Sequence, residues 1–103
     1  MIDVDTLAFH SVVLEARNPV LVDFWAKWCK PCQALLPVLE QVEKKYTNVS
    51  FVKIDVEICS SVVARYGIRS IPTLVVFNKG KPVTSITGNY TEAKIQQVLK
   101  EIK

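Results

Sequence analysis

Two cysteines separated by two residues, Cys29 and Cys32, are the residues of this sequence best suited to chemistry. Apolar residues recur at helical spacing after Cys32, so Cys29 is expected at or just before a helix start. Unpaired backbone N–H groups and the positive end of the helix dipole favour a thiolate there, and Pro31 suits the first helical position because no N–H is needed. Since a thiolate is the nucleophile of disulfide exchange, the spacing predicts that Cys29 attacks and that the more buried Cys32 follows.

A structural zinc site and a pair of inert core thiols are the alternatives for these cysteines. Zinc normally takes four ligands, and the sequence has neither a second cysteine pair nor a pair of histidines. The other candidate ligands, Cys59 and His10, belong to unrelated segments. Three cysteines are also too few and too unevenly spaced for a disulfide framework. We therefore predict redox chemistry without a metal.

Asp23 is the second chemical candidate, because it interrupts the apolar run 20–26. A carboxylate inside an apolar strand is costly unless it has a role or a partner, and its nearness to the cysteine helix predicts a place beneath the dithiol. Lys53, in the neighbouring apolar run 51–54, is its natural charge partner. The alternatives are a capping carboxylate at a strand end and a solvated, edge-facing lysine.

The elements that must position these residues follow from apolar periodicity and turn residues. The sequence predicts helices over 6–16, 32–46, 60–66 and from 91 onward, and strands over 20–26, 49–56, 73–77 and 82–87. The first helix carries the apolar residues Leu7, Phe9, Val12, Val13 and Ala16. Pro37 is expected to kink the second helix without ending it, and residues 78–81 to form a tight hairpin turn. This order predicts a mixed central sheet with helices on both faces.

The 103 residues, half of them apolar, fit one globular domain over residues 1–103. The net charge of +3 comes from scattered Lys and Arg without an aromatic-interleaved basic stripe, so nucleic-acid binding is not expected. No apolar run approaches the ~18 residues of a membrane span. The acidic start lacks the basic and apolar parts of a signal peptide. These features predict a cytoplasmic protein that does not bind membranes.

Several runs of the sequence resemble the thioredoxin family. The resemblance is carried by residues 22–32, residues 66–74, and the glycines Gly80 and Gly88. It covers essentially the whole chain. It implies an α/β thioredoxin fold, in which a central mixed five-stranded sheet is flanked by four helices.

The resemblance also implies roles for individual residues. Asp23 is expected to take the proton from Cys32 through water when Cys32 attacks the mixed disulfide, and burial is expected to raise its pKa. Pro72 is expected to form a cis peptide bond facing the cysteines, which leaves the backbone of Ile71 free to pair with an extended substrate. Without the resemblance, an ordinary strand-entry proline would be preferred at Pro72.

An apolar rim that docks a protein substrate is expected around Cys29. Its members would be Trp28, Ile68, Ile71 and Gly88. Core packing is the alternative for Trp28, and Trp25 is expected to be the more inward of the two tryptophans.

Two residues depart from the family pattern. Lys30 stands where the family usually has Gly, and a cation beside Pro31 between the cysteines should favour the Cys29 thiolate and make the disulfide more oxidising. The alternative is that Lys30 points into solvent and alters only the choice of partner. Cys59 is expected to be a buried small hydrophobe, with a regulatory role as the alternative.

The resemblance implies a general protein disulfide reductase that needs no bound cofactor. Thioredoxin reductase, drawing on NADPH, would recycle it, and the clients would include ribonucleotide reductase, peroxiredoxin and methionine sulfoxide reductase. The protein is expected to be a monomer. A disulfide oxidase or isomerase and a non-catalytic binding module are the competing hypotheses, and retention of both cysteines with Asp23 argues against the module.

Overall fold

A five-stranded sheet in the order β1-β3-β2-β4-β5 forms the centre of the computed structural model, which describes residues 1–102. The strands are β1 (Ile2–Asp3), β2 (Val20–Trp25), β3 (Ser50–Asp55), β4 (Thr73–Asn78) and β5 (Lys81–Ile86). The helices are α1 (Thr6–Phe9), continued by the π-helical η1 (His10–Leu14), then α2 (Lys30–Lys45), α3 (Ser60–Arg65) and α4 (Glu92–Lys100). Strands β1, β3 and β2 are parallel, and β4 and β5 are antiparallel to their neighbours. The predicted mixed sheet flanked by helices is confirmed.

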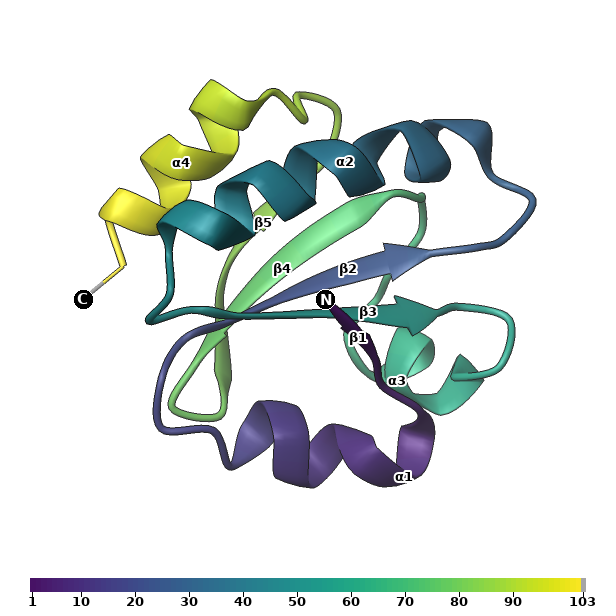
Figure 1. Ribbon diagram of the computed structural model, residues 1–103. Coiled ribbons are helices and arrows are strands. Elements are labelled where there is room, and N and C mark those ends of the chain that lie inside the picture. Colours follow the sequence, from purple (N-terminus) through teal and green to yellow (C-terminus); the bar gives the residue numbers. More distant parts are fainter. Residues whose placement is uncertain (103) are drawn as a thin grey trace.

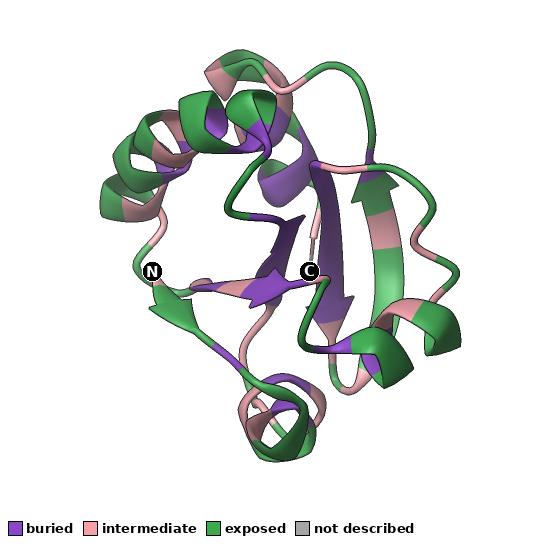
Figure 2. Ribbon diagram, turned by 90° about the vertical axis from the view of Figure 1, so that its right-hand side faces the viewer, coloured by how far each residue is buried: buried purple, intermediate pink, exposed green. Residues whose placement is uncertain are grey.

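The helices form two layers, with α2 and α4 on one face of the sheet and α1 and α3 on the other (Figure 1). Every residue of β2 is buried, because both faces of this strand are covered. Leu21 packs with Leu35 and Leu39 in the core beneath α2 and α4, whereas Val22 packs with Phe9 in the opposite core. Figure 2 shows the contrast between the buried central strands and β5, which is largely exposed.

The first helical segment differs from its prediction in two respects. It begins as α1 and continues as π-helical η1, and it ends at Leu14 instead of residue 16. Among its apolar residues, Leu7 is 92% exposed. Phe9 and Val13 are the buried residues of this segment. Leu7 and Phe9 are two residues apart and therefore about 200° apart around a helix, so both cannot face the sheet. The segment before it, β1, was not predicted because two exposed residues carry no periodic signal.

The remaining elements follow their sequence signals. Helix α2 continues through Pro37, as predicted, and α4 begins after Thr91, whose hydroxyl accepts a hydrogen bond from Lys94 N at 3.2 Å. The turn between β4 and β5 places Lys79 at φ 54° and Gly80 at φ 81°. Two consecutive positive φ angles are the geometry of the type I′ turn that suits the twist of a two-residue hairpin.

Two glycines with positive φ provide a matched test of the fold: Gly67 follows α3, and Gly80 lies in the hairpin turn. Gly67 (φ +63°) has open space where a Cβ would lie, whereas a Cβ on Gly80 would lie 3.0 Å from the carbonyl oxygen of Leu14. We expect Gly67→Ala to cost about 1 kcal/mol of unfolding free energy from its backbone conformation alone. Gly80→Ala should cost more, because the hairpin must also move away from η1. Urea unfolding of both variants measures the difference, and equal losses would contradict the close approach.

Candidate active site

Cys29 and Cys32 form a disulfide at the N-terminus of α2, with their Cα atoms 5.2 Å apart. Cys29 is the N-cap of the helix, in an extended conformation, and its Sγ accepts a hydrogen bond from Cys32 N at 3.2 Å. Cys29 is 5% exposed and Cys32 is fully buried. The predicted position of Cys29 just before the helix and the deeper burial of Cys32 are confirmed. A backbone N–H aimed at the Cys29 sulfur is also the interaction that would stabilise a thiolate there.

Lys30 and Pro31 occupy the first two positions of α2. Pro31 is therefore one position later than expected, but its missing N–H still falls among the first four of the helix, which have no partner within it. The Lys30 side chain is exposed. Its charge thus lies beside the disulfide but in contact with solvent.

Asp23 lies in the middle of β2, fully buried, and neither of its carboxyl oxygens has a hydrogen-bond partner. Asp23 lies two residues after Leu21, and residues two apart in a strand point to the same face. Asp23 therefore faces the side of the sheet that α2 covers, as Leu21 does. The strand then ends at Trp25, which packs in one cluster with Cys29 and Cys32. Burial raises the pKa of Asp23 to about 7, and the positive charge of Lys53 opposes this rise only in part. A carboxyl group with such a pKa can both release and accept a proton near neutral pH.

Lys53 is the registered neighbour of Asp23 on β3, but the two are not hydrogen-bonded. Its ammonium lies 4.5 Å from the centroid of the Trp25 ring and 3.8 Å from Asp3 Oδ1. The expected pairing with Asp23 is therefore electrostatic at longer range, and the contacts of Lys53 are with a ring and with the carboxylate of β1. Asp3 was not a sequence candidate, because β1 itself was not predicted.

A pocket of about 280 Å³ adjoins the disulfide end of α2. It is lined by Trp28, Val56, Val63, Ile68, Arg69, Ser70 and Ile71. Trp28 is 66% exposed and Trp25 is 9% exposed, so the expected inner and outer tryptophans are confirmed. Three of the four expected rim residues meet here, whereas Gly88 does not line this pocket. Val56 was missed, although it directly follows β3 at the end of the sheet where β2 leads to the cysteines.

The Ile71–Pro72 peptide bond is cis, as expected. Ile71 packs against the cluster that contains Cys29 and Cys32, which places this turn beside the disulfide. The carbonyl oxygen of Pro72 accepts a hydrogen bond from the Tyr90 hydroxyl. Tyr90 was missed, because nothing in the sequence links it to residues so distant in the chain.

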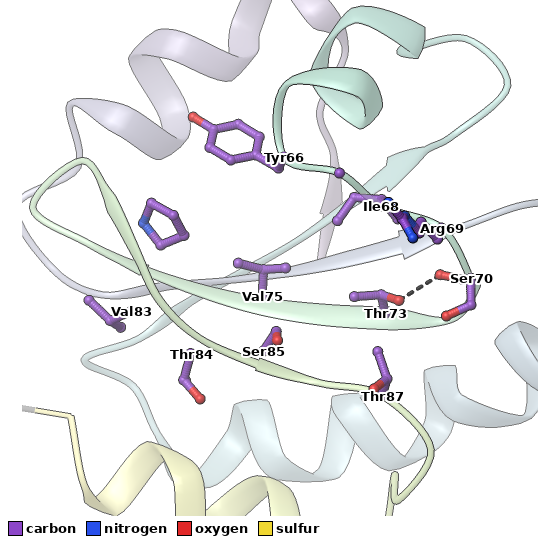
Figure 3. A pocket seen from close by; sticks show the side chains of 12 residues that line it. Tyr66, Ile68, Arg69, Ser70, Thr73, Val75, Val83, Thr84, Ser85 and Thr87 are labelled. Carbon is purple, nitrogen blue, oxygen red and sulfur yellow. Dashed lines mark hydrogen bonds between the residues drawn. The ribbon is translucent and has the colours of Figure 1, made fainter.

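A second, larger groove of about 420 Å³ shares the loop residues Ile68, Arg69 and Ser70 with that pocket and extends along β4 and β5 (Figure 3). Hydroxyl side chains are frequent along it, and Thr73 Oγ1 donates to Ser70 O at 2.5 Å. The groove was not predicted, since it is formed by an exposed face of β5 whose residues carry no strong apolar pattern.

Within residues 1–102, no group of three potential metal ligands lies close enough to hold an ion. Cys59 is fully buried, and its Sγ lies 3.8 Å from Val4 O, so the expected buried thiol is confirmed. His10 lies on the surface beside Glu15. Among the described helices, none is both long and apolar enough to cross a bilayer.

Comparison with known proteins agrees with this geometry. A protein-family model described as thioredoxin matches residues 1–101. Thioredoxin C-2 of Corynebacterium nephridii is 44% identical over 88 residues, covering 84% of this chain and 82% of the relative. The chloroplastic M-type thioredoxin of Chlamydomonas reinhardtii is 43% identical over 94 residues, covering 90% and 67%. Thioredoxin 1 of Synechococcus elongatus is 41% identical over 92 residues, covering 88% and 86%.

The raised pKa of Asp23 predicts a specific pH dependence of stability. The folded state, with a pKa of about 7, holds this proton more tightly than an unfolded chain with a pKa near 3.8. The stability contributed by protonated Asp23 is therefore complete below pH 4 and is lost as pH rises through about 7. Asp23→Asn should remove this loss and gain about 2–3 kcal/mol relative to wild type between pH 5 and pH 8. Urea unfolding of the oxidised proteins at each pH tests this, and parallel pH curves would contradict it.

Proposed function

The chain belongs to the thioredoxin family and is a thiol–disulfide oxidoreductase with a redox-active Cys29–Cys32 pair, and we propose that it acts as a general reductase of protein disulfides. The observation that carries the proposal is the position of this pair, at a helix N-terminus and beside an exposed apolar pocket. A nucleophile next to an apolar docking surface suits a protein substrate better than a small polar one.

In the first step, the Cys29 thiolate attacks one sulfur of the client disulfide. A bond forms between Cys29 Sγ and that sulfur, the client S–S bond breaks, and the other client sulfur leaves as a thiolate. The hydrogen bond that Cys29 Sγ accepts from Cys32 N supports this assignment, because it stabilises the attacking anion. Cys29 is also the less buried of the two cysteines.

In the second step, Cys32 attacks Cys29 Sγ, and the second client sulfur leaves. Asp23 accepts the proton of Cys32 through a water molecule, so that a thiolate is present when the attack occurs. Two electrons pass from the dithiol to the client, and the Cys29–Cys32 disulfide forms. The full burial of Asp23 and its pKa of about 7 support this role. Lys53 modulates the charge of Asp23 from a distance.

The client docks on the pocket beside Cys29. Trp28, Ile68 and Ile71 supply its apolar contacts, and the backbone of Ile71 pairs with an extended segment of the client before the cis Pro72. Gly88, in the loop after β5, is exposed and has no side chain, so it allows a client backbone to approach. Gly88 would thus contact the client beside the pocket, because it is not one of the residues that line the pocket.

We further propose thioredoxin reductase as the electron donor and ribonucleotide reductase, peroxiredoxin and methionine sulfoxide reductase as clients, because family members need a reductase and disulfide-bearing partners. Work in the reductive direction needs a reducing compartment, which supports the cytoplasm as the site of action. The protein would act there as a monomer. No nucleic acid or membrane takes part.

Cysteine variants test the proposed reductase directly. In an insulin turbidity assay with dithiothreitol, the wild type should accelerate precipitation, whereas Cys29→Ser should be inactive because no nucleophile remains. Cys32→Ser should accumulate mixed disulfides with clients, which mass spectrometry identifies. Cys59→Ala, which leaves both redox cysteines in place, is the matched control and should retain activity. An inactive wild type, or a Cys32→Ser variant that traps no protein, would oppose the proposal.

Lys30 is expected to make the disulfide more oxidising than a glycine would. Its charge beside the Cys29 thiolate stabilises the reduced form, which raises the reduction potential. Lys30→Gly should therefore lower the potential measured against glutathione. Lys30→Gln removes the charge without the backbone freedom of glycine and should lower it by a similar amount. An unchanged or higher potential in both variants would contradict the proposed oxidising effect of Lys30.

A further inference from the structure

Three charged residues form a row across the parallel part of the sheet, at one level on three adjacent strands. Asp3 on β1 and Asp23 on β2 are both registered with Lys53 on β3. Registered neighbours point to the same face, and adjacent strands are about 4.8 Å apart, so one carboxyl group lies on each side of the lysine. The lysine can therefore approach either carboxyl group.

The ammonium of Lys53 forms an ion pair with Asp3 and makes no hydrogen bond to Asp23. It is 3.8 Å from Asp3 Oδ1 and 4.5 Å from the centroid of the Trp25 ring, while both oxygens of Asp23 lack a hydrogen-bond partner. The electrostatic attraction of the ring for a cation adds to that of the carboxylate. A direct contact with Lys53 would instead stabilise the charged form of Asp23.

The other carboxylates at this end of the sheet accept hydrogen bonds from neighbouring backbone N–H groups. Asp5, before α1, accepts a hydrogen bond from Ala8 N at 2.8 Å, and Asp55, at the end of β3, accepts one from Glu57 N at 2.9 Å. Both carboxylates line a cavity of about 420 Å³ together with Asp3, Lys53 and Lys27. Helix α2, which covers this face of the sheet, begins at the Cys29–Cys32 disulfide, which carries no charge. Asp3 is thus the carboxylate of this cavity that forms an ion pair with Lys53.

We propose that Asp3 is a positioning residue of the active site, which holds the Lys53 ammonium over Trp25 and keeps it from a direct ion pair with Asp23. This inference rests on the proposed role of Asp23 in proton transfer. It assigns a function to the short edge strand β1, which is otherwise exposed and has no part in the exchange chemistry.

Direct titration of Asp23 tests the placement of Lys53. The pKa of Asp23 is read from the pH dependence of its carboxyl carbon in NMR spectra of the oxidised protein, in which the redox thiols do not titrate. Asp3→Asn should lower this pKa by about half a unit, because a negative charge is lost and Lys53 becomes free to approach Asp23. Glu40→Gln removes an equal charge from the exposed side of α2 and should leave it unchanged. An unchanged pKa in both Asp3→Asn and a second variant, Asp3→Ser, would overturn the proposal.

A second background separates positioning from the direct effect of charge. In Lys53→Met, the Asp3→Asn substitution should shift the pKa of Asp23 much less than in wild type, because no ammonium remains to be released. An equal shift in both backgrounds would mean that Asp3 acts as a simple charge, and the positioning role would be wrong.

The rate at which Cys32 resolves the mixed disulfide tests the role of Asp23 in proton transfer separately from the positioning role of Asp3. Release of the second client thiol from a mixed disulfide should reach its pH midpoint at lower pH in Asp3→Asn, in parallel with the titration. If Asp23→Asn resolves the mixed disulfide at the wild-type rate, the catalytic role of Asp23 is wrong. The titration would still decide whether Asp3 holds Lys53.

Discussion

The burial of β2 on both faces is the constraint on which the site depends. A strand covered by two helical layers buries Asp23 where its carboxyl oxygens have no hydrogen-bond partner, and this burial raises its pKa. The same strand ends at Trp25, from which the chain turns directly into the disulfide at the start of α2. One strand and the helix that follows it therefore position both the buried carboxyl group and the redox-active cysteine pair.

The site is assembled from segments that are far apart in the chain. The disulfide belongs to the N-terminus of α2, the pocket beside it combines Trp28 with residues after β3 and α3, and the cis Pro72 begins the antiparallel half of the sheet. Each segment lies at the same end of the central strands, where loops can vary without disturbing the core. The redox-active pair and much of the pocket beside it thus come from different elements: the pair belongs to the start of α2, and the loop from Ile68 to Ile71 lines the pocket.

The sequence could predict whatever is encoded locally. Helical spacing after Cys32 correctly placed Cys29 at the start of α2, and a lone carboxylate in an apolar run identified Asp23 as buried. The hairpin turn over residues 78–81 and the start of the last helix near residue 91 were equally local. What could not be predicted depends on pairing between distant segments: the strand β1, the contact of Asp3 with Lys53, and the hydrogen bond from Tyr90 to Pro72. The cis bond at Pro72 was expected only from the family resemblance, since most prolines are trans.

Cys59 has a consequence for observing the motions of this molecule. In the oxidised protein it is the one free thiol of the three cysteines, and it is fully buried between the sheet and the layer of α1 and α3. An alkylating reagent can reach it only when that layer separates from the sheet. When opening and closing are fast relative to modification, the rate of alkylation reports the equilibrium population of the open form. The free thiol of Cys59 thus provides the oxidised protein with an intrinsic probe of local opening on the face of the sheet opposite α2.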